Sequence, residues 1–276
     1  MKKRLLMRFR YIIYITLVII IPCKIYAFDI TVGATTWYAW GNRYEDVQEK
    51  SIRKNSSYAF DPSFLYGPIF SVKINDDFNL TFVYLYSKFN YTFNYYKDEG
   101  GNLFIDSKIK RSDSDLALNY RLNNYLKLFM GAKYLAYDIK LSYIDYDDDY
   151  WSSHSKHTSI GPGLGLNATF PITNNIFLLG TLSGFYLFST GEKFEDKRMY
   201  DDIVIPVNMT IGYNEYGFNS NISIAYYIAP ASTVISLGAR LQYFITDYYD
   251  YEPFLINKIE NIFYGITLTA TYTFNI

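Results

Sequence analysis

Residues 264–276 alternate strictly between two kinds of side chain. The apolar positions are Tyr264, Ile266, Leu268, Ala270, Tyr272, Phe274 and Ile276. Glycine, threonine and asparagine occupy the positions between them. Because successive side chains of a β-strand point to opposite faces of a sheet, this pattern predicts a strand with one apolar and one polar face.

The same alternation recurs along the chain, for example at 30–40, 80–87, 115–122, 160–170 and 235–243. Helical periodicity is hard to find, and no stretch after residue 27 approaches the ~20 apolar residues that a membrane-spanning helix needs. The chain is therefore predicted to be all-β. Alternation alone fits both a soluble exported β-sandwich and a barrel whose apolar face contacts lipid.

Residues 1–27 are predicted to be a signal peptide, with residues 28–276 forming the mature domain. This segment has six basic residues, no acidic residue, and an apolar run at Tyr11–Ile21 that is too short to span a bilayer comfortably. Cleavage is expected after Ala27. A lipoprotein anchored at Cys23 is the alternative, and Pro22 directly before it argues against it.

The charge of the mature chain excludes one class of partner. The whole chain has 26 basic and 27 acidic residues, so removing the six basic residues of the signal leaves 20 against 27, a net charge of −7. Such an acidic chain lacks the basic surface that binds phosphate backbones, and no nucleic acid partner is expected. The mature chain also has no cysteine, because Cys23 is the only one.

Connection lengths favour a barrel over a sandwich. Short polar turns lie at 75–77, 123–124 and 173–175, and they alternate with long polar segments at 41–61, 94–108, 142–157, 190–202 and 247–261. Outer-membrane barrels have short periplasmic turns and long external loops. Aromatic pairs at the predicted strand ends would form interfacial girdles: Trp37-Tyr38, Trp40, Tyr95-Tyr96, Tyr150-Trp151 and Tyr248-Tyr249.

The alternating stretches predict an antiparallel up-and-down transmembrane β-barrel of ten strands. The strands are expected at 29–40, 62–74, 79–92, 109–122, 126–140, 158–171, 176–189, 203–228, 232–246 and 262–274. Twelve strands are the alternative, reached if 247–258 is itself a strand. If both chain ends face the periplasm, the number of strands must be even.

The signal peptide, the all-β body and the terminal strand together resemble a small bacterial outer-membrane β-barrel protein. In that superfamily the last strand acts as an assembly signal, and Leu268, Ala270, Tyr272, Phe274 and Ile276 match its alternation, with Ile276 in place of the usual terminal aromatic residue. The resemblance implies location in the bacterial outer membrane, contact with its lipid, and the barrel assembly machinery as a partner during biogenesis. It implies no particular activity.

Charged residues on the polar faces are predicted to point into the barrel, because Lys or Arg facing lipid at mid-membrane would cost ~2–4 kcal/mol. They are Lys73, Asp115, Arg121, Lys127, Lys133 and Arg240. Barrels near eight strands are filled by side chains, whereas wide aqueous channels have sixteen or more. A filled interior is therefore favoured over a cation-lined pore.

The long segments are acidic and rich in tyrosine, and Tyr146, Tyr150 and Trp151 are the candidate residues for binding an extracellular ligand. An interfacial, merely solubilising role for them is the alternative. The two histidines, His154 and His157, lie in one of these segments. We predict neither a metal site nor a catalytic site there, because a loop would not align ligands or hold a base against a nucleophile.

We therefore predict a non-enzymatic, porin-like barrel without a cofactor, with a structural or surface-binding role carried by its extracellular loops. A narrow diffusion channel for small solutes or ions is the alternative. A hydrolase borne on the barrel and a soluble sandwich are the less favoured readings. The sequence names no ligand or solute.

Overall fold

The computed structural model describes residues 29–49, 52–96, 102–144, 150–198, 204–205, 209–248 and 256–275. Side chains are described at 29–43, 59–92, 106–142, 152–192, 210–248 and 258–274. The predicted signal peptide, residues 1–27, lies outside the described residues, as does Ile276.

Ten long strands and one two-residue strand make up the sheet. They are β1 (Asp29–Glu49), β2 (Ile52–Lys73), β3 (Phe78–Tyr96), β4 (Asn102–Arg121), β5 (Leu126–Ile144), β6 (Tyr150–Pro171), β7 (Ile176–Arg198), β8 (Val204–Ile205), β9 (Met209–Ile228), β10 (Thr233–Tyr248) and β11 (Ile256–Asn275). One 3-10 turn, η1 (Ala229–Ala231), joins β9 to β10.

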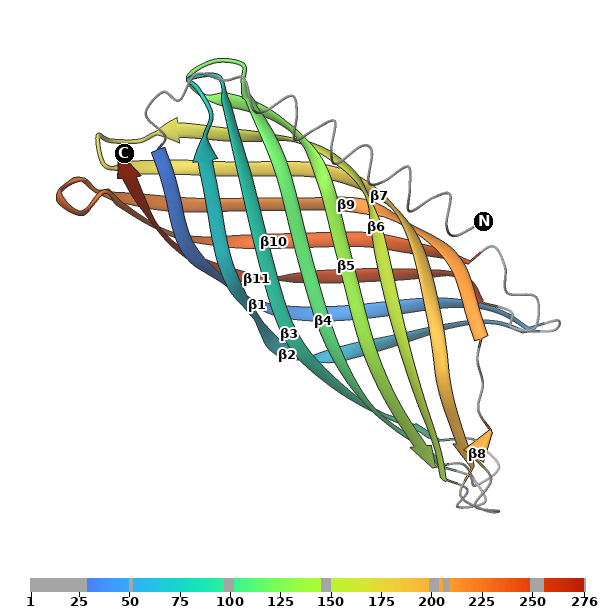
Figure 1. Ribbon diagram of the computed structural model, residues 1–276. Helices are drawn as coiled ribbons and strands as arrows, with labels where there is room; N and C mark the ends of the chain where they lie inside the picture. Colours follow the sequence, from blue (N-terminus) through green and yellow to red (C-terminus); the bar gives the residue numbers. More distant parts are fainter. Residues whose placement is uncertain are drawn as a thin grey trace.

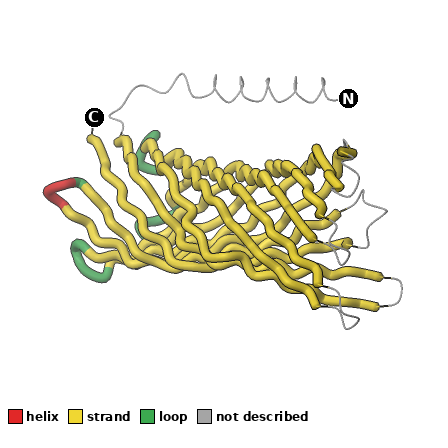
Figure 2. Tube along the Cα trace, turned by 90° about the horizontal axis from the view of Figure 1, so that it is seen from below, coloured by secondary structure: helices red, strands yellow, loops and turns green. Residues whose placement is uncertain are grey.

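The sheet closes on itself. Each long strand pairs antiparallel with its neighbours in the chain, β7 pairs with β9, and β1 pairs with β11 from Asp29↔Asn275 onward. The strands slant around the barrel in Figures 1 and 2. This confirms the predicted up-and-down barrel of ten strands rather than twelve, since β10 and β11 pair directly with one another up to Asp247↔Lys258, and β8 only adds two residues beside β7.

Short turns gather at one end of the barrel, together with the C-terminus, at the upper left of Figure 1. We call this the turn end. Side chains close the turns locally: Asn75 Oδ1 accepts the backbone N–H groups of Asp77 and Phe78 at 2.9 and 2.8 Å. Asn123 does the same for Tyr125 and Leu126. These side-chain turns explain why Asn recurs at the predicted turn positions.

The opposite end, which we call the extended end, differs from the prediction. Most of the segments expected as long loops are paired strand: β1 continues to Glu49 and β2 begins at Ile52, with the register Glu49↔Ile52. Likewise β5 continues to Ile144 and β6 begins at Tyr150. The alternation reverses there, because Phe89 and Ile109 are buried on the inner face while Lys88 and Lys110 are exposed on the outer face, although backbone pairing continues.

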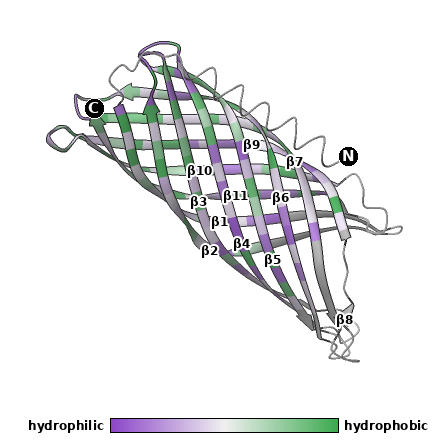
Figure 3. Cartoon of the chain, viewed as in Figure 1, coloured by the Kyte–Doolittle hydropathy of each residue, from purple (hydrophilic) through white to green (hydrophobic). Residues whose placement is uncertain are grey.

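Apolar side chains cover the outer wall. Along β7 and β9 they include Leu182, Tyr186, Phe188, Ile222 and Ile224, all exposed. In Figure 3 hydrophobic and hydrophilic segments alternate along the strands, as expected when successive side chains face opposite sides of one wall. An exposed apolar surface of this extent is stable only against an apolar medium.

The protein core lies inside the barrel. Its buried apolar residues are Trp37, Ala39, Phe60, Leu65, Leu85, Phe89, Ile109, Leu135, Phe185, Leu187, Phe244 and Phe263. Trp37 was expected in an interfacial girdle, and that prediction is wrong, because its side chain is fully buried in the interior. Tyr38 and Trp40, on the other parity of β1, form an edge-to-face pair at 4.8 Å.

Among the described residues no helix is long and apolar enough to cross a membrane.

Candidate functional site

A packed layer crosses the interior at mid-height. Its apolar members come from five strands and are 0–2% exposed: Trp37, Leu65, Leu85, Leu135 and Leu187. Each occupies an inward position of its strand, so rings and branched side chains from around the barrel meet near its axis. Packing of this kind excludes water. With the polar network described next, we call it the central layer.

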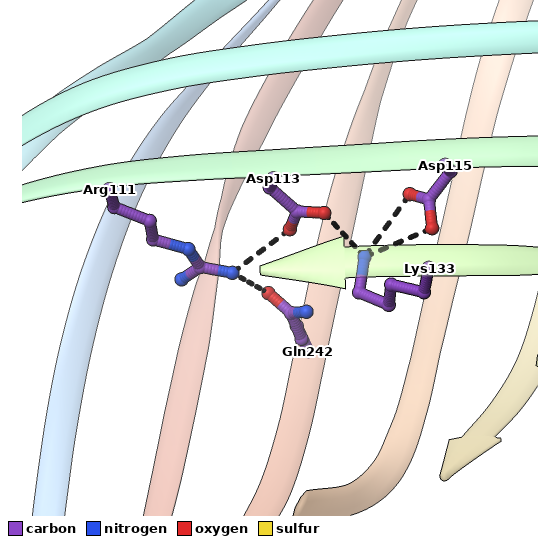
Figure 4. A network of polar contacts seen from close by, with 5 residues as sticks. All are labelled: Arg111, Asp113, Asp115, Lys133 and Gln242. Carbon is purple, nitrogen blue, oxygen red and sulfur yellow. Dashed lines mark hydrogen bonds and ion pairs between the residues drawn. The ribbon is translucent and has the colours of Figure 1, made fainter. Parts of the chain in front are cut away.

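The polar part of the central layer is a chain of ion pairs and hydrogen bonds (Figure 4). Asp113 sits between two cations: its Oδ2 accepts a hydrogen bond from Arg111 Nη2 at 3.0 Å, and its Oδ1 accepts one from Lys133 Nζ. Lys133 also donates to Asp115 at 3.0 Å, and Arg111 donates to Gln242. Buried charges persist when they are paired and hydrogen-bonded in this way.

Two cavities lie on either side of this layer, and no residue lines both. Lys133 lines the cavity toward the turn end, of about 420 Å³. Arg111 lines the cavity toward the extended end, of about 360 Å³. Because Asp113 bonds both residues, the network marks the boundary between the two spaces. We call them the turn-end cavity and the extended-end cavity.

The turn-end cavity is polar. Asn167 donates to Asn119 at 3.0 Å and accepts from Thr181 at 2.8 Å, so amide and hydroxyl groups of β4, β6 and β7 form a ladder across the interior. Arg240 also lines this cavity, and its guanidinium lies 4.6 Å from the Trp37 ring. This cation–π contact connects the cavity wall to the central layer.

The extended-end cavity is aromatic. The rings of Phe60 and Phe244 both stack with the ring of Phe263. The centroid distances to Phe263 are 5.7 and 6.2 Å, and the interplanar angles are 10° and 8°. Phe89 packs against Phe263 at 5.7 Å. The Arg111 guanidinium lies 4.4 Å from the same ring, which places a cation at the aromatic floor of the cavity.

Several buried polar atoms around the extended-end cavity have no hydrogen-bond partner within the described part of the chain. They are Nε and Nη1 of Arg111, the hydroxyl oxygen of Tyr137, and Oε2 of Glu215. All three residues line the cavity, and Arg111 and Glu215 are 0% and 3% exposed. Buried polar groups are normally satisfied, so these atoms mark an interior that can still accept partners.

The six charged residues predicted to face the lumen are placed as follows. Lys133, Asp115 and Arg240 line the turn-end cavity near the central layer, and Lys127 lines it nearer the turns. A third cavity at the barrel rim is lined by Lys73, Arg121 and Lys127. There Lys73 pairs with Asp76 at 2.9 Å and with Asp29 at 3.7 Å, and Arg121 donates to Asn124.

Sequence reasoning missed the central members of the network, Arg111, Asp113 and Gln242, together with Glu215. Parity would have found the first two, since they share the odd-numbered face of β4 with Asp115. Gln242 shares its face with Arg240 in the same way. Glu215 lies in the predicted strand 203–228, to which the sequence analysis assigned no inward or outward face.

The loop and terminal-strand candidates have separate outcomes. Tyr146 lies outside the described residues, and Tyr150 and Trp151 are the first residues of β6, where only the backbone is described. On β11, Leu268, Ala270, Tyr272 and Phe274 all face outward and are exposed, while the strand joins β10 to β1.

The histidines were expected in a loop, and that placement is wrong, because both lie on β6. His154 bonds Asp138 through Nε2 at 2.9 Å on the outer face. His157 faces the interior, where its Nε2 lies 3.2 Å from Ser155 Oγ and its Nδ1 lies 3.1 Å from the Tyr213 hydroxyl. Within the described ranges no group of three or more His, Cys, Asp or Glu side chains could hold a metal ion.

Comparison with solved structures finds outer-membrane proteins. The outer membrane protease OmpT from Escherichia coli has 12% identity and a TM-score of 0.47, with 90% of this chain and 97% of that chain covered. The translocator domain of the autotransporter NalP from Neisseria meningitidis has 8% identity and a TM-score of 0.46, covering 97% and 95%. OprG from Pseudomonas aeruginosa has 9% identity and a TM-score of 0.39, covering 91% and 96%.

At these values the likenesses carry no argument about function. No protein-family model and no curated protein matches the chain. The closed barrel, its apolar outer wall and its packed interior define the class on their own: the chain is a β-barrel membrane protein of the outer-membrane type. Its outer wall is in contact with membrane lipid.

Proposed function

We propose that this protein is a sealed, non-enzymatic barrel that binds a partner or ligand at its extended end, on the cell-surface side. The observation that supports this best is the central layer. Arg111, Asp113 and Lys133 fill the interior together with Gln242, and each is at most 2% exposed. A solute or hydrated ion would have to break buried ion pairs to pass, which is costly when one charge is left without its partner.

The extended end has a polar outer surface on which a partner could bind. Its strands project beyond the apolar belt, so that β3–β6 carry polar outward side chains such as Lys88, Lys110, Asp138 and Lys156. The predicted role of Tyr146, Tyr150 and Trp151 belongs to the same end. A rigid paired wall that carries short connecting segments is a precise scaffold for recognition.

The non-enzymatic part of the proposal is supported by the histidine geometry. His154 and the inward Ser155 lie on opposite faces of β6. His157 lies within reach of Ser155, but its second ring nitrogen faces the Tyr213 hydroxyl, where a hydrolytic triad would use a carboxylate. We expect no ester hydrolysis above the buffer rate, and hydrolysis lost in His157→Ala would contradict this.

A narrow channel is the second candidate. Cavities of about 420 and 360 Å³ already lie on both sides of the central layer, so its opening would connect them. A channel predicts that Lys133→Glu or Arg240→Glu changes ion selectivity.

Swelling of proteoliposomes in small sugars separates the two functions. The full chain, with its barrel confirmed by heat-modifiable mobility on a gel, is expected to give no swelling above empty liposomes. A protein-dependent, size-limited uptake of sugars would contradict the sealed barrel and favour the channel.

A further inference from the structure

We propose that the extended-end cavity is a binding site for a small aromatic carboxylate that also carries a hydrogen-bond donor, such as a hydroxyl group. The inference names a ligand class for the proposed surface-side binding function and rests on it. The site lies in the barrel interior, and the loop residues predicted to bind a ligand do not line it.

Size and shape suit one aromatic ring with small substituents. The volume of about 360 Å³ is at the lower end of the ~300–1,000 Å³ of small-molecule pockets. The rings of Phe60, Phe263 and Phe244 line the cavity and stack with one another, and aromatic rings prefer offset-stacked or edge-on neighbours. A planar ring is therefore a better occupant than a flexible chain.

Arg111 provides the recognition of an anion. Its Nη2 is engaged by Asp113 and Gln242, which fixes the guanidinium plane, while Nε and Nη1 keep N–H groups without partners among the described residues. Hydrogen bonds from a guanidinium to a carboxylate are charge-assisted and directional. The residue is thus held in place by the central layer, lines the cavity, and retains N–H donors without a described partner.

Glu215 and Tyr137 supply complementary groups. Glu215 is 3% exposed and accepts a hydrogen bond from Thr246 at 3.3 Å through Oε1. The Ser159 hydroxyl lies beside its carboxylate, and Oε2 has no hydrogen bond within the described residues. That oxygen would accept a hydrogen bond from a hydroxyl group on the ligand ring. The unpartnered Tyr137 hydroxyl can donate to the ligand carboxylate beside Arg111.

The cavity wall favours an anionic ligand through hydrogen-bond donors and not through net charge. The charged side chains that line it are Arg43, Arg111 and Glu215, and the Arg111 charge is already balanced by Asp113. Asp113 and Asp115 do not line this cavity. Asp113 lies on the far side of the Arg111 guanidinium, and Asp115 lies beyond Lys133. The turn-end cavity lacks this combination of stacked rings and unpartnered charged atoms.

The test is isothermal titration of the full chain in detergent micelles with 4-hydroxybenzoate, benzoate and cyclohexanecarboxylate. We expect binding of 4-hydroxybenzoate, weaker binding of benzoate, and the weakest binding of the non-planar acid. Arg111→Gln should weaken 4-hydroxybenzoate binding by about tenfold or more. Glu215→Gln should weaken it by a smaller factor. Phe89→Leu, which removes an aromatic wall, should also weaken it.

Matched variants in the other cavity are the controls. Arg240→Gln and Phe129→Leu make the same substitutions in the turn-end cavity and should leave the affinity unchanged. Tyr137→Phe, which removes one hydroxyl and keeps the ring, guards against a failure of Arg111→Gln to fold, and it should weaken benzoate binding several-fold. Heat-modifiable mobility reports folding for each variant.

The outcomes separate this inference from the proposed function. A folded barrel that is silent in the swelling assay but binds none of the three acids overturns the ligand class and leaves the sealed barrel standing. Equal losses in Arg111→Gln and Arg240→Gln overturn the site. A barrel that conducts sugars contradicts the proposed function, whatever it binds.

Discussion

Lys133 and Asp113 form a buried ion pair between neighbouring strands inside the barrel, with side chains only 3% and 1% exposed. The two residues are diagonal neighbours, because Lys133 lies directly opposite Asp115 and Asp113 lies opposite Leu135. Lys133 therefore reaches both Asp113 and Asp115 on β4 from one position on β5. The Lys133–Asp113 ion pair therefore connects the wall of the turn-end cavity to Arg111, which lines the extended-end cavity.

The first prediction concerns the stability of this pair. Lys133→Met keeps the length of the side chain but leaves Asp113 buried with only Arg111 to balance it. Removing one partner of a buried ion pair typically destabilises a protein by about 3–5 kcal/mol. We expect a loss of this size in the free energy of unfolding, measured by urea titration of the refolded barrel in lipid vesicles.

The double variant Lys133→Met/Asp115→Asn is the control. It removes the carboxylate that loses its cation, keeps the Arg111–Asp113 ion pair, and should recover part of the lost stability. If the single variant unfolds at the same urea concentration as the native protein, the ion pair has no structural role.

The second prediction compares two glycines on the inner face of β6. A Cβ atom at Gly161 would lie 2.0 Å from the backbone oxygen of Tyr186, whereas at Gly163 the nearest atom is 3.6 Å away. Gly161→Ala should therefore push β6 and β7 apart and cost about 1–3 kcal/mol of stability. Gly163→Ala should be tolerated.

Refolding yield and urea midpoint of both alanine variants check this. Equal behaviour of the pair would mean that β6 and β7 do not approach as closely as described.

The third prediction is a dependence on pH at the turn end. The Lys73 ammonium donates a hydrogen bond to Asp76 at 2.9 Å, and this contact together with its charge lowers the pKa of Asp76 below its ordinary value of 3.8. A lowered pKa in the folded state stabilises the protein above the unfolded-state value, and the contribution is lost as the pH falls through the folded-state value.

Asp76→Asn should consequently flatten the loss of stability below pH 3.8, where the native protein weakens. The effect should be small because the pair is exposed and screened by salt. Urea midpoints across an acid pH series, with Asp77→Asn as the matched control in the same turn, measure it. The same acid dependence in native protein and Asp76→Asn would count against a contribution from this ion pair.

The barrel itself could be predicted because its wall separates two media. Alternation such as that of Leu268, Ala270 and Tyr272 survives only where one face meets an apolar medium and the other a polar one. The turn positions were equally readable, because Asn75 and Asn123 close their turns with their own side chains. These are local signals, and a single sequence carries them.

The interior arrangement could not be read in the same way. Which inward side chains meet depends on the tilt and stagger of strands far apart in the chain, and Arg111 and Gln242 are 131 residues apart. Trp37 was misplaced for a related reason. It was grouped with its neighbours in the sequence, Tyr38 and Trp40, which face lipid, although its odd-numbered position on β1 puts it on the inner face. Strand ends at the extended end were missed because the alternation reverses there: polar side chains such as Lys88 face outward and apolar ones such as Phe89 face inward.

Single-channel conductance of the refolded protein in a planar bilayer tests the sealed interior most directly. A variant with a hollowed central layer, Trp37→Ala/Leu135→Ala/Lys133→Ala, serves as the conducting control and shows that inserted barrels are detected. The account predicts a silent native protein beside a conducting variant. Steady, reproducible conductance steps from the native protein would contradict it.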